Sequence, residues 1–131
     1  MKRFNFMLAI VLVLTSLYAN ANERATFTQP QLVSLQAAPL APAYTLLDVR
    51  SAKEYQAGHI KGALNISHST LGEQLNLMPQ DKDQMVIVYC RSGRRAGIAE
   101  QLLKAKGYTQ VKHLSGDMNG WLESNLPVES H

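Results

Sequence analysis

One cysteine and three arginines in the second half of the chain have the types and spacing of a reactive site. Cys90 is the only cysteine in the sequence, and Arg91, Arg94 and Arg95 follow it closely. Thiolate is the reactive form of cysteine, and both neighbouring cations and a helix N-terminus stabilise it. Cations at a helix start cost about 0.3–1 kcal/mol each unless a negative charge lies beside them. The segment therefore predicts a thiolate nucleophile in a cradle of backbone amides that also binds an anion.

The segments on either side of Cys90 are predicted to be the strand and the helix that position it. The run Met85–Tyr89 is short, apolar and β-branched, which is typical of a strand buried on both faces. After the turn of residues 90–95, alanine and leucine recur at helical spacing, and Gly107 suits a left-handed helix end. Cys90 is thus predicted to lie at the carboxyl end of a strand, where α/β sheets bind their ligands.

Two interpretations of these residues are open from the sequence. A lone cysteine is commonly buried and inert, and arginines in a turn commonly form a solvated surface. We favour the reactive thiolate and anion binding because the arginines surround Cys90 at a helix start. The spacing does not indicate which arginine points inward. The Ser92 hydroxyl either donates to a bound anion or only suits the turn.

The remaining apolar segments alternate between strand and helix patterns along the chain. They predict an α/β fold, a single domain with a largely parallel central sheet flanked by helices. The other predicted strands are residues 44–49, 63–66 and 111–114. The other predicted helices are residues 29–36, 52–57, 69–77 and 118–124. Residues 23–27 show no clear pattern.

Asp48 and Arg50 stand at the end of a second predicted strand, at the same edge of the sheet as Cys90. We favour an ion pair that closes the strand and supports the active-site loop over a direct catalytic role. His68, His113 and His131 show no metal-ligand spacing with one another or with Cys90, so we predict no metal site. Trp121 is expected to anchor the last helix in the core.

The residues around Cys90 resemble the active-site loop of the rhodanese family of sulfurtransferases. Cys90-Arg91-Ser92-Gly93-Arg94-Arg95 follows a hydrophobic strand and opens a helix, as the loop of that family does. Two further groups of residues stand in the family's order and together extend the resemblance over residues 44–128. They are Asp48-Val49-Arg50, Glu54-Tyr55, Gly58-His59-Ile60, Gly62-Ala63 and Asn65-Ile66 upstream, and Leu114, Gly116, Gly120-Trp121 and Pro127-Val128 downstream.

The resemblance implies a sulfurtransferase in which Cys90 is the catalytic residue and holds sulfane sulfur as a persulfide. Thiosulfate or another sulfane-sulfur donor would load it, and cyanide or a thiol would accept the sulfur. Asp48 and Arg50 would support the loop, His59 would belong to a structural turn, and no cofactor is needed. Arg95 is the first choice for the inward-facing cation because it resembles the basic residue that closes the family's loop. The residues implied to bind the substrate are Arg91, Ser92, Gly93, Arg94, Arg95 and Ala96.

Two other functions fit the same loop. A non-catalytic sulfur carrier would need the same cradle around Cys90. A cysteine-dependent phosphatase or arsenate reductase is less favoured, because the loop of those enzymes has one residue more than the interval from Cys90 to Arg95. The chain departs from the rhodanese pattern at Ser67 and at Ser115-Gly116-Asp117, and the latter predicts an extra negative charge at the substrate mouth.

The N-terminus has the pattern of a secretory signal peptide. Lys2 and Arg3 precede an apolar run, residues 6–17, and Ala19-Asn20-Ala21 provides a cleavage site, so we expect residues 1–21 to be removed. The run is short for a membrane span of about 20 residues, which predicts a periplasmic or secreted protein without a stable membrane anchor. Residues 22–43 are expected to form an N-terminal helix and linker before the domain of residues 44–128.

Charge provides little support for a nucleic-acid partner. The formal net charge of +3 owes two units to Lys2 and Arg3 in the segment expected to be removed. No basic stripe with interleaved aromatic residues occurs outside the Cys90 loop. We therefore predict small anionic substrates and no nucleic acid, and the sequence makes no prediction of the oligomeric state.

Overall fold

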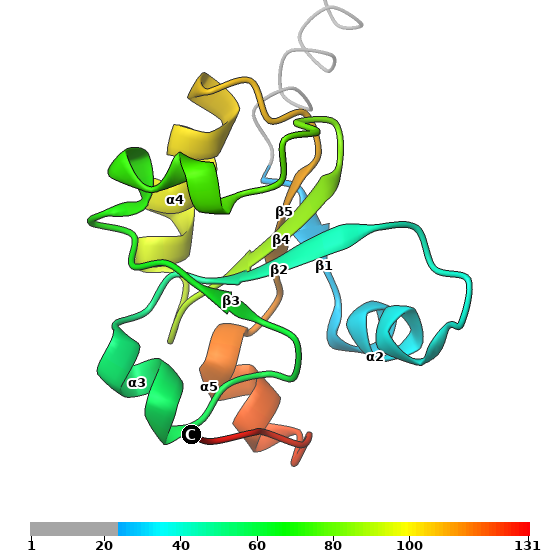
Figure 1. Ribbon diagram of the computed structural model, residues 1–131. Helices are drawn as coiled ribbons and strands as arrows, with labels where there is room; N and C mark the ends of the chain where they lie inside the picture. Colours follow the sequence, from blue (N-terminus) through cyan, green and yellow to red (C-terminus); the bar gives the residue numbers. More distant parts are fainter. Residues whose placement is uncertain (1–23) are drawn as a thin grey trace, which may run out of the picture.

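The computed structural model describes residues 24–131, and the predicted signal peptide, residues 1–21, lies outside these residues. Within them a five-stranded sheet has the strand order β1-β5-β4-β2-β3, and every pair of neighbouring strands is parallel (Figure 1). The strands are β1 (Thr26–Phe27), β2 (Tyr44–Asp48), β3 (Leu64–Asn65), β4 (Met85–Tyr89) and β5 (Val111–Leu114). The predicted α/β fold with a parallel sheet is confirmed.

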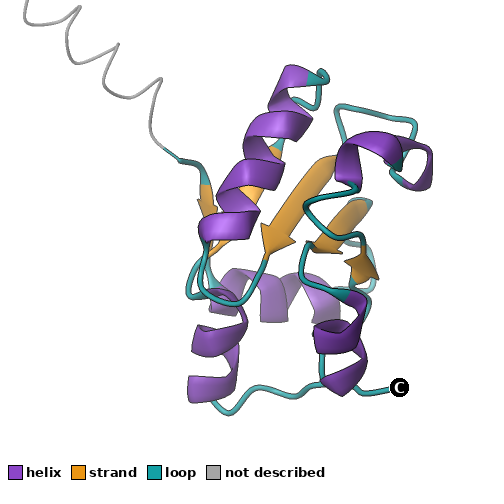
Figure 2. Ribbon diagram, turned by 90° about the vertical axis from the view of Figure 1, so that its left-hand side faces the viewer, coloured by secondary structure: helices purple, strands orange, loops and turns teal. Residues whose placement is uncertain are grey.

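Helices cover both faces of the sheet (Figure 2). Helix α4 and two short 3-10 turns lie on one face, and the other three α-helices lie on the opposite face, so the domain has three layers. The α-helices of the described residues are α2 (Gln29–Ala37), α3 (Ala52–Ala57), α4 (Arg94–Ala105) and α5 (Asp117–Glu123).

The side chains of the central strand β4 divide the core into two parts. Successive residues of a strand point to opposite faces of the sheet. Val86 and Val88 therefore pack in the core beneath α4, together with Cys90, which follows in the same phase. Ile87 and Tyr89 pack in the second core, with residues of α2 and α5. The alternation therefore places the Cys90 side chain on the face of the sheet that α4 covers.

Two helix starts follow from local hydrogen-bonding chemistry. Ser51 and Glu54 form a reciprocal capping box at α3, which confirms the start predicted for this helix. Thr28 and Gln31 form a second capping box at α2, with Pro30 in the first turn. Both caps satisfy amide groups that a helix N-terminus leaves without a partner.

The structure corrects one predicted element and adds a strand that the sequence did not predict. Residues 69–77 were expected to form a helix, but they form two 3-10 turns, η1 (Leu71–Glu73) and η2 (Leu75–Leu77). Each turn closes with a hydrogen bond over three residues and ends, which suits a short connector. Residues 23–27 showed no pattern, yet β1 lies within them as an edge strand beside β5. Two residues are too few for a periodic signal, and β1 depends on its pairing with β5.

No helix within residues 24–131 combines the length and the apolar character that a membrane crossing requires.

Candidate active site

The loop that carries Cys90 connects β4 to α4 and turns a backbone amide toward the sulfur. Cys90 follows the last residue of β4, and α4 begins four residues later at Arg94. The Gly93 amide donates a hydrogen bond of 3.0 Å to the Cys90 Sγ. An amide directed at this atom stabilises negative charge on it. Arg91, Ser92 and Arg94 are exposed around the loop.

Gly93 is required by the geometry of this turn. Its φ angle is +120°, in the region that residues with a side chain rarely adopt. A Cβ atom at this position would lie 3.2 Å from the Asp117 Oδ2 atom. The glycine therefore allows both the turn and the close approach of a carboxylate behind it.

The Cys90 side chain is buried, and it also has the hydrogen bond expected of a reactive sulfur. Only 1% of Cys90 is exposed. The sequence left a buried, inert cysteine and a reactive cysteine as alternatives, and the structure combines burial with an inward-facing amide. Burial of this degree favours small reactants at the sulfur of Cys90.

The first turn of α5 holds the backbone of the loop. The Cys90 amide donates to the Asp117 Oδ1 atom at 3.0 Å. The amides of Met118 and Asn119 donate to the carbonyl groups of Cys90 and Arg91, at 2.9 and 3.1 Å. Asp117 is only 2% exposed, so the prediction that its negative charge lies at the substrate mouth is wrong. The carboxylate lies behind the loop.

Arg95 is paired with an acidic residue of α3. Its guanidinium group donates to the two Glu54 carboxylate oxygens at 2.7 and 3.0 Å. This bidentate pair lowers the pKa of Glu54 to about 2. Arg95 was the first choice for the substrate-binding cation, and in the structure its charge is balanced by Glu54, which ties the start of α4 to α3.

Arg24 supports the loop from the N-terminal end of the described chain, a role that the sequence did not suggest. Its Nη2 atom donates to the Gly93 carbonyl at 3.1 Å and also to the Glu100 carboxylate. The Nε atom donates to the other oxygen of Glu100 at 2.8 Å. Glu100 is 3% exposed and lies on α4, so this pair joins the segment before β1 to the loop and its helix.

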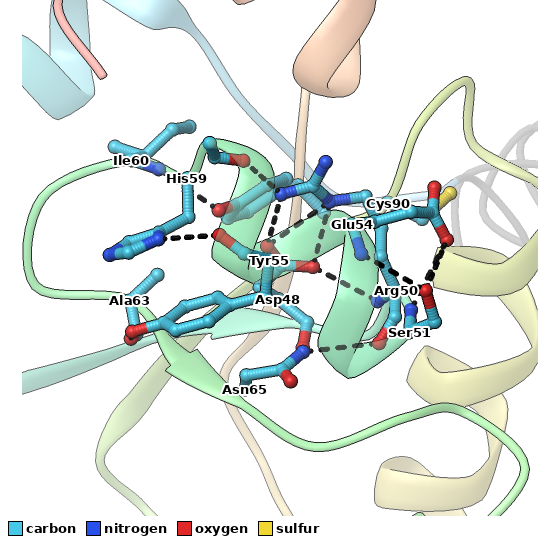
Figure 3. A network of polar contacts seen from close by, with 12 residues as sticks. Asp48, Arg50, Ser51, Glu54, Tyr55, His59, Ile60, Ala63, Asn65 and Cys90 are labelled. Atoms are coloured by element: carbon cyan, nitrogen blue, oxygen red, sulfur yellow. Dashed lines mark hydrogen bonds and ion pairs between the residues drawn. The ribbon is translucent and has the colours of Figure 1, made fainter. Parts of the chain in front are cut away.

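Asp48 and Arg50 form the predicted ion pair at the end of β2 (Figure 3). The Arg50 Nη2 atom donates to the Asp48 Oδ2 atom and to the Gly58 carbonyl, each at 2.7 Å. Both residues of the pair are buried. The guanidinium carbon also lies 5.7 Å from the centre of the Tyr89 ring, so the pair contacts the residue before Cys90.

A pocket of about 360 Å³ opens beside the loop. Arg50, Glu54, Arg91 and Asn119 provide its polar lining. Its apolar lining comes from α3, α5 and the C-terminal segment, namely Ala57, Gly58, Met118, Leu122 and Val128. The pocket therefore joins an exposed cation of the cysteine loop to an apolar wall.

The histidine and tryptophan positions agree with structural roles. His59 is buried, its Nδ1 atom lies 2.8 Å from the Tyr55 carbonyl oxygen, and its ring stacks on Tyr55 (Figure 3). Trp121 is buried and donates from Nε1 to the Pro127 carbonyl at 2.9 Å, as expected for a core anchor. Residues 24–131 contain no group of three metal-ligating side chains that could hold an ion.

A parallel sheet whose central strand leads into a cysteine-containing loop and then a helix is the architecture of a rhodanese-type α/β domain. The family model described as Rhodanese-like domain matches residues 29–124. The chain belongs to this family. The crystal structure of the Alr3790 protein from Anabaena sp. has the same fold, with a TM-score of 0.72 and 28% identity, and the alignment covers 80% of this chain and 82% of that one.

Characterised relatives differ in what their names describe. Thiosulfate sulfurtransferase PspE of Escherichia coli is 37% identical over 60% of this chain and 75% of its own length. Human thiosulfate:glutathione sulfurtransferase is 36% identical over 75% of this chain and 93% of its own. A tRNA uridine(34) hydroxylase of Erwinia tasmaniensis is 33% identical over 66% of this chain, but the match spans 27% of that protein. The domain is thus shared with sulfurtransferases and with a longer enzyme of another class.

Proposed function

We propose that this chain is a thiosulfate sulfurtransferase that moves sulfane sulfur through a persulfide on Cys90. The observation that carries the proposal is the Gly93 amide, 3.0 Å from the Cys90 Sγ in the turn between β4 and α4. A single sulfur atom is a small group, which agrees with the burial of the cysteine. The names of the Escherichia coli and human relatives support thiosulfate as the donor.

The first half-reaction loads the enzyme. The Cys90 thiolate attacks the outer sulfur of thiosulfate, a new S–S bond forms, and the S–S bond of thiosulfate breaks. The electron pair of that bond leaves with sulfite, so charge is conserved and Cys90 becomes a persulfide anion. Backbone amides of residues 91–96 stabilise the terminal sulfur, while exposed Arg91 and Arg94 attract the dianionic donor.

The second half-reaction returns the cysteine to its thiolate. Cyanide or a thiolate attacks the terminal sulfur, and the electron pair of the breaking bond returns to the Cys90 Sγ. Thiocyanate or the persulfide of the acceptor is released. We assign the acceptor to the pocket beside Arg91, whose apolar wall includes Met118 and Leu122 and suits the carbon chain of an organic thiol.

Turnover with thiosulfate and cyanide tests the proposal directly. We expect parallel lines in a double-reciprocal plot for wild type, as for a two-step covalent mechanism, and no turnover for Cys90→Ser. Protein treated with thiosulfate alone should gain about 32 Da, the mass of one sulfur, at Cys90. Loading without turnover with either cyanide or thiols would indicate a sulfur carrier instead. Hydrolysis of a phosphate ester as fast as thiosulfate turnover would refute the sulfurtransferase assignment.

We also propose that the protein is a periplasmic or secreted member of this family. The support is the charged and then apolar N-terminal segment that ends at Ala19-Asn20-Ala21. Expression of the full chain in a Gram-negative host, followed by cell fractionation and N-terminal sequencing, tests it. The mature protein should begin at Asn22 in the periplasm, and an uncleaved chain in the cytoplasm would refute the proposal.

A further inference from the structure

Asp117 occupies a backbone conformation that usually selects glycine. It is the first residue of α5, and its φ angle is +53°. A residue with a side chain is uncommon there, and the conformation persists only where surrounding contacts stabilise it. Asp117 is also one of the residues at which the chain departs from the rhodanese pattern. Contacts of the buried Asp117 carboxylate must therefore offset the cost of this backbone conformation.

The contacts of Asp117 point to the cysteine. The Oδ1 atom accepts the hydrogen bond of the Cys90 amide at 3.0 Å. The His113 Nε2 atom lies 3.0 Å from Oδ1 and 2.9 Å from Oδ2, which orients the carboxylate from the end of β5. Both partners are buried with Asp117. The carboxylate is therefore fixed on two sides and faces the backbone of the reactive residue.

We propose that Asp117, oriented by His113, is a positioning residue that fixes the Cys90 sulfur beneath the amide of Gly93. The inference rests on the proposed function. Asp117 holds the Cys90 amide and the adjacent Met118 amide holds the Cys90 carbonyl, so both peptide groups of the cysteine are tied to α5. The Asp117 carboxylate also lies against Gly93, the residue that supplies the amide to the sulfur.

The two amide groups of this loop therefore have different functions: that of Cys90 anchors the backbone to Asp117, and that of Gly93 contacts the sulfur. The Cys90 amide points to the carboxylate and is withdrawn from the anion cradle, whereas the Gly93 amide points to the sulfur. Without the carboxylate the Cys90 peptide can rotate, and the distance from Sγ to the Gly93 amide is no longer fixed. A misplacement of about 1 Å at the reacting atom can lower the rate about 100-fold. We therefore expect the rate of sulfur loading to fall more than the affinity for thiosulfate.

Two substitutions at Asp117 separate positioning from folding. Asp117→Gly removes the carboxylate, and glycine adopts the positive φ angle without the steric cost of a side chain. Asp117→Asn keeps an oxygen that can accept from Cys90 and an amide that can donate to His113, and asparagine tolerates this conformation. We expect Asp117→Gly to lower kcat about tenfold or more at nearly unchanged KM, and Asp117→Asn to remain within about threefold of wild type.

A pair of variants at His113 provides an independent test if Asp117→Gly does not fold. The side-chain nitrogen of Gln can replace Nε2 as a donor to the carboxylate, whereas Leu leaves that side of Asp117 without a donor. His113→Leu should lower the rate of sulfur loading about tenfold, and His113→Gln should recover most of it. Equal rates for these two variants would overturn the proposed orientation of Asp117.

The loading rate is measured in a single turnover with thiosulfate, and the melting temperature of every variant is recorded. A folded Asp117→Gly protein that loads sulfur within twofold of the wild-type rate would overturn the inference, as would an Asn variant as slow as the Gly variant. Alkylation of Cys90 by iodoacetamide gives a readout that needs no sulfur donor. If wild type fails to transfer sulfur but Asp117→Gly still changes the alkylation rate, the proposed function fails and the positioning role stands.

Discussion

Replacing Glu54 with Gln should make the protein less stable at neutral pH, and the loss of stability should be about half as large at pH 3.5. Glu54 and Arg95 form two hydrogen bonds of 2.7 and 3.0 Å, and Arg95 lowers the pKa of Glu54 from 4.5 to about 2. At face value this change is worth about 3 kcal/mol. Solvent screens the pair because the side chains are 33% and 22% exposed, which reduces the expected loss of unfolding free energy to about 1 kcal/mol.

The pH dependence follows from the direction of the change in pKa. A carboxyl group whose pKa is lower in the folded state contributes its full stability above the unfolded value of about 4.5. The contribution decreases as the pH falls toward about 2, where the folded protein also takes up the proton. Near pH 3.5 about half of the effect should remain.

Urea unfolding of wild type and Glu54→Gln at pH 7 and at pH 3.5 measures this difference. Glu123→Gln is the matched control, because Glu123 is exposed and forms no ion pair within residues 24–131. The control should change the unfolding free energy by less than about 0.5 kcal/mol at both pH values. A Glu54→Gln protein as stable as wild type at pH 7, or equally destabilised at both pH values, would refute the role assigned to the pair.

Two further substitutions test the supports of the loop. Gly93→Ala should cost about 1–3 kcal/mol of unfolding free energy and abolish sulfur loading. The φ angle at this position is +120°, and the new Cβ atom would lie 3.2 Å from the Asp117 Oδ2 atom. Gly72→Ala, at a position with an ordinary φ angle, is the control in thermal unfolding. Arg24→Ala should cost about 2 kcal/mol, since it leaves buried Glu100 without its partner, while Arg24 itself is 39% exposed. Adding Glu100→Gln to Arg24→Ala should restore part of that loss in urea unfolding, and an undiminished loss would contradict the pairing argument.

Local patterns in the sequence were sufficient to predict most of the fold. The β-branched run before Cys90 and the capping box of Ser51 and Glu54 act within a few residues, and both were confirmed. Residues 69–77 were predicted to be helical because periodicity alone does not distinguish a helix from successive 3-10 turns. The edge strand β1 had no local signal, because its two residues are ordered by pairing with β5.

The candidate site likewise has a part that could be predicted from the sequence and a part that could not. The loop of residues 90–95 is contiguous, so its residue types could be interpreted together from the sequence. Its supports come from distant parts of the chain, and no local pattern relates Glu54 to Arg95 or Arg24 to Glu100. Asp117 could be recognised as an unusual residue near the last strand, but only the fold shows that its carboxylate is buried behind Cys90.

The supports also change which charges can act on a substrate. Acidic partners within residues 24–131 balance Arg95 and Arg24, whereas exposed Arg91 and Arg94 have no ion pair in that part of the chain. Long-range attraction of an anionic donor depends on charge that is not locally neutralised. Under the proposed function, attraction of thiosulfate to this loop therefore depends on Arg91 and Arg94, and Arg91 also lines the neighbouring pocket. The paired arginines contribute rigidity, and rigidity is what keeps the Gly93 amide directed at the sulfur.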